Sequence, residues 1–220
     1  MNIVIIVFAG NGSRIKSEMP KQFIKVKNQE LFLHSVKIFQ EHPQIDSIVL
    51  VTNGFFVDHV KRLIKKESLS KVKEVLEGGV NRQDSVRIGL EAVIFNDDDK
   101  VLIHDGDRPL VNQDLITRLL KGLEDNTSSI PILKKSDEME GSDNLGREIT
   151  IDGEVYDVQT PQCFSANLIK TIHHRLIGED YPDDASMMEA LNGKVTYISG
   201  DKYNFKITTI RDLEFFTSII

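Results

Sequence analysis

The sequence has little cysteine and little uninterrupted hydrophobic sequence. Cys163 is the one cysteine among 220 residues, which excludes a disulfide framework or a cysteine-based zinc site within one chain. The apolar segment at residues 3–8 is too short for a signal peptide and is soon followed by glycines. No apolar run is long enough to cross a bilayer. We therefore expect a cytoplasmic protein without a membrane partner.

Positive charge is also in deficit. The chain has 27 lysines and arginines against 34 acidic residues, a formal net charge of −7, whereas nucleic-acid-binding domains are usually basic. Three cations nevertheless follow the first glycine-rich loop, at Arg14, Lys16 and Lys21. A local cationic pocket in an acidic protein indicates a small anionic ligand and argues against nucleic acid as a partner.

Hydrophobic periodicity predicts strands that alternate with helices. Continuous β-branched runs ending at glycine or acidic residues are typical of buried parallel strands, and their alternation with helices predicts βαβ units with right-handed crossovers. We expect strands at 3–8, 47–52, 72–76, 100–104 and 195–198, and helices at 31–40, 57–66, 83–95, 115–123, 166–175, 184–191 and 213–219.

The pattern changes after about residue 132. Residues 134–153 are polar, contain glycine and offer little core material. One interpretation is an exposed loop; the other is a β-hairpin arm reaching a partner subunit, which the alternating stretch EITI at 148–151 favours. We therefore expect one domain over residues 1–220, with a dimerisation arm at approximately 134–157.

Three of the expected strands end in charged, glycine-containing segments, which read AGNGSR, GGVNRQDS and HDGDRP. Ligands of open α/β sheets bind beyond the carboxyl ends of the strands. Glycine, arginine and aspartate at these ends therefore predict one ligand site built from segments far apart in the sequence.

The first glycine loop does not fit two common nucleotide-binding motifs. A dinucleotide fingerprint requires a third glycine where this chain has Ile15, and a Walker loop requires a lysine followed by serine or threonine. The remaining interpretation is an anion nest of backbone N–H groups around Gly10 and Gly12. Arg14 and Lys21 then suit a triphosphate, although Lys21 by itself could be a solvated surface lysine.

Six segments, in order along the chain, resemble the cytidylyltransferases that form CDP-polyols, namely the 2-C-methyl-D-erythritol 4-phosphate and ribitol 5-phosphate enzymes. The segments are AGNGSR with PKQF, GGVNRQDSV, HDGDRPLV, QTPQ, DDAS and NFKITT. The resemblance implies a Rossmann-like, mostly parallel mixed sheet with helices on both faces and a small β-arm. It also implies a homodimer, Mg²⁺ as cofactor, and transfer of CMP from CTP to a polyol phosphate with release of pyrophosphate.

The resemblance also assigns roles to charged residues. Arg14, Lys21 and Lys206 match cations that bind the triphosphate and the transition state, Asp105 matches the metal ligand, and Arg108 matches a residue that holds the substrate phosphate. The attacking phosphate oxygen is already an anion, so positioning and charge neutralisation are sufficient for this reaction. Asp105 could instead be a helix cap or turn residue, and we expect Lys206 at a strand end near the sheet centre.

The resemblance places a cytosine pocket around the first and third strand ends. A tight pocket formed by backbone groups favours a pyrimidine over a purine by fit, with Arg82 organising its loop. The residues expected to bind the nucleotide are Phe8, Ala9, Gly10, Gly12, Gly79, Val80, Arg82 and Ser85.

Other segments have simpler interpretations. His104 is expected to be packed or hydrogen-bonded structure, because this reaction needs no proton relay. QTPQ is expected to form a structural turn, and Asp183, Asp184 and Ser186 are expected to cap a helix.

The acceptor half of the pattern departs from the methylerythritol enzymes. Asp152 stands where they have a phosphate-binding arginine, so Lys135 or Arg147 would have to substitute, and Asp107 replaces a small or apolar residue. The segment HDGxRPL is more similar to that of the ribitol 5-phosphate enzymes, whereas the segment DDAS is more similar to that of the methylerythritol enzymes. The alternatives are a sugar 1-phosphate nucleotidyltransferase, or a nucleotide-binding protein whose acceptor site has decayed.

Overall fold

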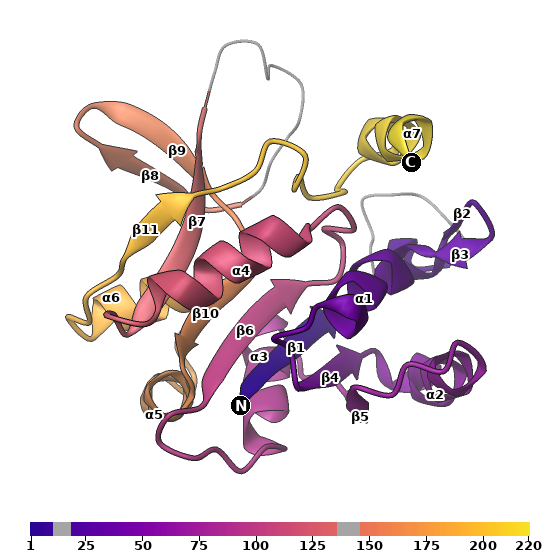
Figure 1. The fold of residues 1–220 in the computed structure, drawn as a ribbon, viewed down its shortest axis with the longest axis horizontal. Helices are drawn as coiled ribbons and strands as arrows, with labels where there is room; N and C mark the ends of the chain where they lie inside the picture. Colours follow the sequence, from indigo (N-terminus) through magenta and orange to yellow (C-terminus); the bar gives the residue numbers. More distant parts are fainter. Residues whose placement is uncertain (11–18, 136–145) are drawn as a thin grey trace.

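The computed structural model describes residues 1–10, 19–135 and 146–220. Its main feature is a mixed sheet with the strand order β5–β4–β1–β6–β10–β7–β9–β8, in which β11 lies beside β7 (Figure 1). The first half of the sheet is parallel and consists of β5 (Val72–Glu77), β4 (Ser47–Thr52), β1 (Asn2–Phe8) and β6 (Lys100–Asp105).

The second half of the sheet is mixed. β10 (Gln162–Ser165) lies antiparallel between β6 and β7 (Ser128–Lys134), and β11 (Tyr197–Ser199) pairs in parallel with β7. The antiparallel strands β8 (Glu148–Ile151) and β9 (Glu154–Val158) extend the sheet beyond β7. These two strands project from the sheet as a hairpin in Figure 1.

Helices cover both faces of the sheet. Alternate side chains of β1 point to opposite faces, so that Val4 and Ile6 join one hydrophobic core, and Ile5 and Val7 join the other. The first core includes α1 (Leu31–Glu41), α2 (Val57–Lys66) and α4 (Gln113–Gly122). The second includes α3 (Arg82–Glu91), α5 (Ala166–Arg175) and α6 (Asp184–Ala190). Burial on both faces explains why residues 3–8 of β1 are all apolar.

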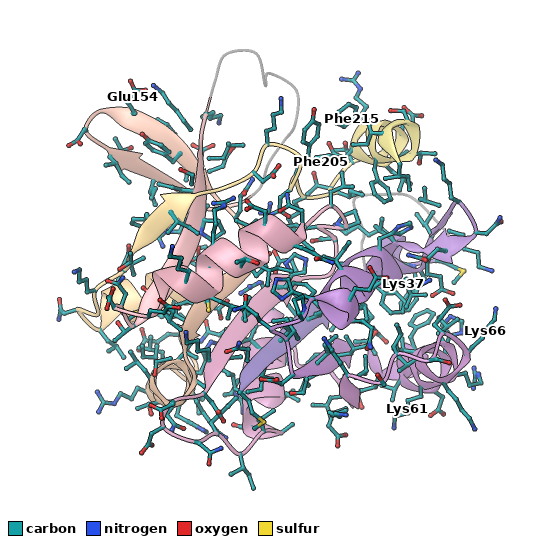
Figure 2. The ribbon with its side chains drawn as sticks, viewed as in Figure 1. Lys37, Lys61, Lys66, Glu154, Phe205 and Phe215 are labelled. Atoms are coloured by element: carbon teal, nitrogen blue, oxygen red, sulfur yellow. The ribbon has the colours of Figure 1, made fainter. Side chains whose placement is uncertain are left out.

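The last helix, α7 (Ile210–Ile219), brings the end of the chain back to the segment near its start. Phe216 of α7 joins a third core with Ile207, Phe205 and Leu31. The rings of Phe205 and Phe215 lie 5.4 Å apart between centroids (Figure 2). The same region holds the 3₁₀ turn η1 (Lys21–Phe23) and the short pair β2 (Lys25–Val26) and β3 (Gln29–Glu30). This packing places Lys21 next to the segment that carries Lys206, because Lys21 Nζ donates to Ile207 O.

The fold confirms the expected class, and the element bounds differ in places. The helix expected at 83–95 ends at Glu91, and the strand expected at 195–198 is β11, two residues later at its start. β7 and β10 were not expected, nor was the 3₁₀ turn η2 (Gly54–Phe56). The expectation of a strand at Lys206 is wrong, because residues 204–208 form no regular element. None of the described helices combines the length and apolar character needed to span a membrane.

Candidate nucleotide-binding site

A cavity of ≈ 360 Å³ lies at the carboxyl ends of β1 and β6, beside the loop that leads into α3. Its lining combines strand ends with segments from near both ends of the chain. The lining residues are Val7, Phe8, Ala9, Gly10, Lys21, Gln22, Gly79, Val80, Asn81, Arg82, Ser85, Asp105, Asp107 and Lys206. This is the edge at which a parallel α/β sheet is expected to bind a ligand.

Asp105 lies at the centre of the charges in this cavity. Its Oδ1 accepts a hydrogen bond from Arg82 Nε at 2.8 Å, and its Oδ2 accepts one from Lys206 Nζ at 2.9 Å. Burial alone would raise the pKa of Asp105, but the charges of Arg82, Lys206 and Arg108 outweigh burial and hold that pKa well below its usual range. Asp105 is therefore an anion at the end of β6.

Asp107 forms a second ion pair on the same loop. Its Oδ2 lies 2.6 Å from Lys21 Nζ, and its Oδ1 lies 3.7 Å from Lys206 Nζ. The main chain reinforces this arrangement, because Ile207 N donates to Asp107 O at 2.9 Å and Lys21 Nζ donates to Ile207 O at 2.6 Å. Lys206 is thus held at the cavity by long-range hydrogen bonds and not by the strand that the sequence suggested.

Arg82 connects Asp105 to a buried acid on α6. Arg82 Nη1 donates to Asp184 Oδ2 at 2.9 Å, and the other Asp184 oxygen lies 2.9 Å from His173 Nε2. Burial opposes ionisation of Asp184, but Arg82 and His173 outweigh it and lower the pKa of that carboxyl. Asp184 is fully buried, so its role is more than that of the helix cap expected from the sequence. The cap itself is confirmed for Asp183, whose Oδ1 accepts from Ser186 N.

The wall next to β5 is built around the loop before α3. Asn81 caps α3 by accepting from Asp84 N at 2.7 Å, and Ser85 Oγ accepts from Gly79 N at 3.1 Å. A Cβ atom on Gly78 would lie 2.4 Å from the Ala9 Cβ, so glycine is required for this loop to approach β1 closely. The loop therefore exposes backbone groups to the cavity.

Gln22 lines the cavity beside the end of β1, and the sequence did not predict a role for it. Its Nε2 donates to Phe8 O at 2.8 Å and to Gly10 O at 2.6 Å, and its side chain is almost fully buried. The residue lies within the PKQF segment, which offered the only sequence signal for it. Gln22 fixes the direction in which the chain leaves β1.

The structure does not bring every predicted residue into the cavity. Arg14 and Gly12 lie outside the described residues. Arg108 is buried and donates to Asn204 O at 2.8 Å and to Val158 O at 3.5 Å, which places its guanidinium between two chain segments. Lys135 is exposed at the end of β7, where it pairs with Glu148 at 2.6 Å. These three contacts lie within the chain, and neither Arg108 nor Lys135 lines the cavity.

His104 is a structural residue, as the sequence suggested. It is fully buried, its Nε2 lies 3.1 Å from Arg108 O, and burial lowers its pKa to about 4. The imidazole is therefore neutral at physiological pH. Its contact with Arg108 O fixes the loop that carries Asp105 and Asp107.

A divalent ion fits the cavity only in combination with a ligand. Among the described residues there is no group of three or more potential metal-binding side chains. Mg²⁺, however, is commonly bound by one or two carboxylates together with phosphate oxygens and water. The ionised carboxylate of Asp105 meets that requirement, provided that one of its cationic partners moves aside.

A family model described as "IspD: 2-C-methyl-D-erythritol 4-phosphate cytidylyltransferase" matches residues 2–220. The chain belongs to the IspD family. Curated relatives of that name include those of Clostridium novyi (strain NT), 35% identical over 100% of this chain and 96% of the relative, and Thermotoga neapolitana, 33% identical over 97% and 94%. Among solved structures, 4-diphosphocytidyl-2C-methyl-D-erythritol synthase from Anaerococcus prevotii DSM 20548 matches with a TM-score of 0.80 and 26% identity, over 99% of this chain and 94% of that chain.

The position at which the resemblance led us to expect an arginine lies in the β8–β9 hairpin. Asp152 is exposed in the turn between β8 and β9, with φ at 50°. Arg147, a candidate to supply the missing positive charge, instead pairs with Asp183 at 3.3 Å and with Glu189. Of the two candidate cations, Lys135 is the more exposed, with 51% of its side chain accessible against 15% for Arg147.

Proposed function

We propose that this chain transfers CMP from CTP to 2-C-methyl-D-erythritol 4-phosphate, giving a CDP-polyol and pyrophosphate for isoprenoid biosynthesis. Membership of the IspD family supports the activity and the acceptor. The single observation that carries the assignment to a site is the convergence of Lys21, Lys206 and Asp105 in one cavity. These residues come from three distant parts of the chain, and two of them are cations suited to phosphate.

The chemistry requires two anions to meet. An oxygen of the acceptor phosphate forms a bond to the α-phosphorus of CTP, and the bond from that phosphorus to the bridging oxygen breaks as pyrophosphate leaves. Lys21 and Lys206 neutralise charge on the triphosphate and orient it. The nucleophile needs no base, which agrees with the buried position and low pKa of His104.

We also propose Mg²⁺ as the cofactor. Asp105 would hold it jointly with the phosphates, and Arg82 would keep the carboxylate oriented. The ion would add to the positive charge that Lys21 and Lys206 supply at the phosphates.

The nucleotide base is proposed to lie between Phe8 or Ala9 and the Gly79–Ser85 loop. This part of the cavity is lined by Ala9, Gly10, Gly79, Val80 and Ser85, and Ser85 Oγ accepts a hydrogen bond from Gly79 N. A pocket of this kind reads the edge of a base through backbone groups. A better fit of a pyrimidine than of a purine is the proposed reason for a preference for cytosine.

Three further proposals concern the cell and the assembly. The enzyme is proposed to act in the cytoplasm and as a homodimer in which the β8–β9 hairpin contacts the partner. Support for the dimer comes from the projecting hairpin (Figure 1) and from the polar composition of residues 134–153. One chain has a mass of 24.9 kDa, and light scattering at micromolar concentration should give twice this mass. A measured mass equal to that of one chain would contradict the dimer.

The test of the main proposal is a panel assay of pyrophosphate release with Mg²⁺. CTP should support turnover with 2-C-methyl-D-erythritol 4-phosphate and much less with ribitol, arabinitol or glycerol phosphates. ATP and GTP should not replace CTP. Preference for ribitol 5-phosphate would overturn the acceptor, turnover of UTP with a hexose 1-phosphate would favour the sugar nucleotidyltransferase, and CTP binding without turnover on the whole panel would favour a decayed acceptor site.

A further inference from the structure

Asp107 lies where three segments meet at one end of the cavity, which we call the phosphate end because we propose that the triphosphate binds there. Its carboxylate pairs with Lys21 from η1 at 2.6 Å and lies 3.7 Å from Lys206. Its carbonyl accepts from Ile207 N at 2.9 Å. The three segments are therefore held together by one acidic residue, at a position where the resemblance led us to expect a small or apolar side chain.

The ammonium of Lys21 is already well satisfied. It has three hydrogen-bond donors, of which one faces Asp107 Oδ2 and another donates to Ile207 O at 2.6 Å. The side chains of Lys21 and Asp107 are only 11% and 15% exposed, so solvent weakens their attraction less than it would at the surface. A triphosphate that binds Lys21 must compete with this pair.

The two carboxylate oxygens of Asp107 have different surroundings. Its Oδ2 has the close contact to Lys21, whereas its Oδ1 is buried and has no hydrogen-bond partner among the described residues. The 3.7 Å separation from Lys206 is an ion pair without a hydrogen bond. Asp107 thus adds negative charge to the cavity, and only one of its two carboxylate oxygens has a close partner.

We propose that Asp107 is an internal counter-ion of Lys21, which the triphosphate displaces on binding, and that it thereby weakens the binding of CTP and speeds the release of pyrophosphate. The proposal rests on the proposed function, because it requires Lys21 to bind the triphosphate. Asp107 acts through Lys21 and repels the phosphates directly, so it sets affinity without taking part in bond formation.

The charges that line the cavity make the direction of the effect clear. The described lining residues include three cations (Lys21, Arg82 and Lys206) and two carboxylates (Asp105 and Asp107). Asp107→Asn keeps the size of the side chain and removes its charge. One like charge in a poorly solvated site changes an ionic equilibrium by about tenfold or more, so we expect this variant to bind CTP and pyrophosphate about tenfold more tightly.

The experiment is calorimetric titration of the full chain with pyrophosphate, and separately with CTP, without an acceptor. Asp107→Asn should lower both dissociation constants about tenfold, and pyrophosphate should become a correspondingly stronger inhibitor of turnover. Asp114→Asn is the matched control, since Asp114 is 78% exposed and pairs with Arg118 on α4, away from the cavity. The control should bind both ligands as the unchanged chain does.

A double-mutant cycle separates the counter-ion role from a structural one. In a Lys21→Met background, the part of the gain that comes from freeing Lys21 should disappear, and the gain that remains measures the direct repulsion between Asp107 and the phosphates. If Asp107→Asn does not fold, Asp107→Ser removes the same charge and allows the same comparison. Unchanged or weaker pyrophosphate binding by a folded variant would overturn the proposal. Because these titrations need no turnover, failure of the acceptor panel would leave their outcome intact.

Discussion

Replacement of Lys206 by methionine gives the most direct test of the phosphate end of the site. Lys206→Met keeps most of the apolar stem and removes the ammonium, whose Nζ lies 2.9 Å from Asp105 Oδ2. The side chain is 19% exposed, so its charge is only partly screened by water. The change therefore removes one cation from the place where charge develops on the triphosphate.

The expected magnitude follows from the charge and its surroundings. Two unit charges about 4 Å apart in a medium of effective dielectric constant about 20 interact by about 4 kcal/mol, and loss of one donor to a developing oxyanion typically costs about 10²–10³ in kcat. We expect kcat to fall by about 10²–10³. The fold should survive, because Asp105 keeps its hydrogen bond from Arg82 at 2.8 Å.

The assay is pyrophosphate release at saturating CTP and acceptor, with thermal unfolding as a check of folding. Lys202→Met is the matched control, because Lys202 is exposed, lies four residues earlier and contacts only the ring of Tyr203 among the interactions described for it. Lys206→Arg should recover part of the activity, since it restores the charge. A folded Lys206→Met enzyme with kcat within a few-fold of the unchanged chain would refute the role of Lys206.

Three further predictions follow from the contacts of the site. Asp184→Asn should lower kcat and the melting temperature together, because Arg82 loses a buried partner at 2.9 Å and holds Asp105 less firmly; steady-state kinetics and calorimetry measure both. The pKa of His104 in the folded chain, about 4, lies below its value in the unfolded chain, so the unfolded state binds the extra proton and stability falls as pH falls. Urea unfolding should show that the free energy of unfolding decreases by about 2 kcal/mol between about pH 6.5 and 5. The His104→Gln variant should not show this decrease. Lys135→Ala should raise the KM of the acceptor without changing the KM of CTP, because Lys135 lies on the exposed arm and outside the nucleotide cavity.

The parallel half of the sheet could be predicted because its strands leave a local signal. β1, β4 and β6 are covered on both faces, so each contains a continuous apolar stretch, at residues 3–8, 48–51 and 101–103. β7 and β10 leave no such signal, since β7 contains Pro131 and Ser128 and β10 has only four residues. Their pairing depends on β10 inserting antiparallel between β6 and β7, which the local sequence does not encode.

The candidate site could likewise be predicted only in part from the sequence. Charged residues at the ends of strands are visible in the sequence, and Lys21, Arg82 and Asp105 do line one cavity. Their partners are not visible, because Arg82 and Asp184 are 102 residues apart and meet only when α3 and α6 join the same core. Long-range hydrogen bonds, and not a strand, hold Lys206 in place.

The charges around the cavity alternate in sign, and this order explains how an acidic protein maintains a cationic site. Lys21, Asp107, Lys206 and Asp105 follow one another at distances between 2.6 and 3.7 Å, and Arg82 continues the series. Each cation is neutralised internally, which limits the cost of bringing like charges together in a poorly solvated space. Binding of an anion to these cations is therefore an exchange of partners. A triphosphate has enough oxygens to contact Lys21 and Lys206 at once, so we expect the alternating charges to favour a polyphosphate over a monophosphate.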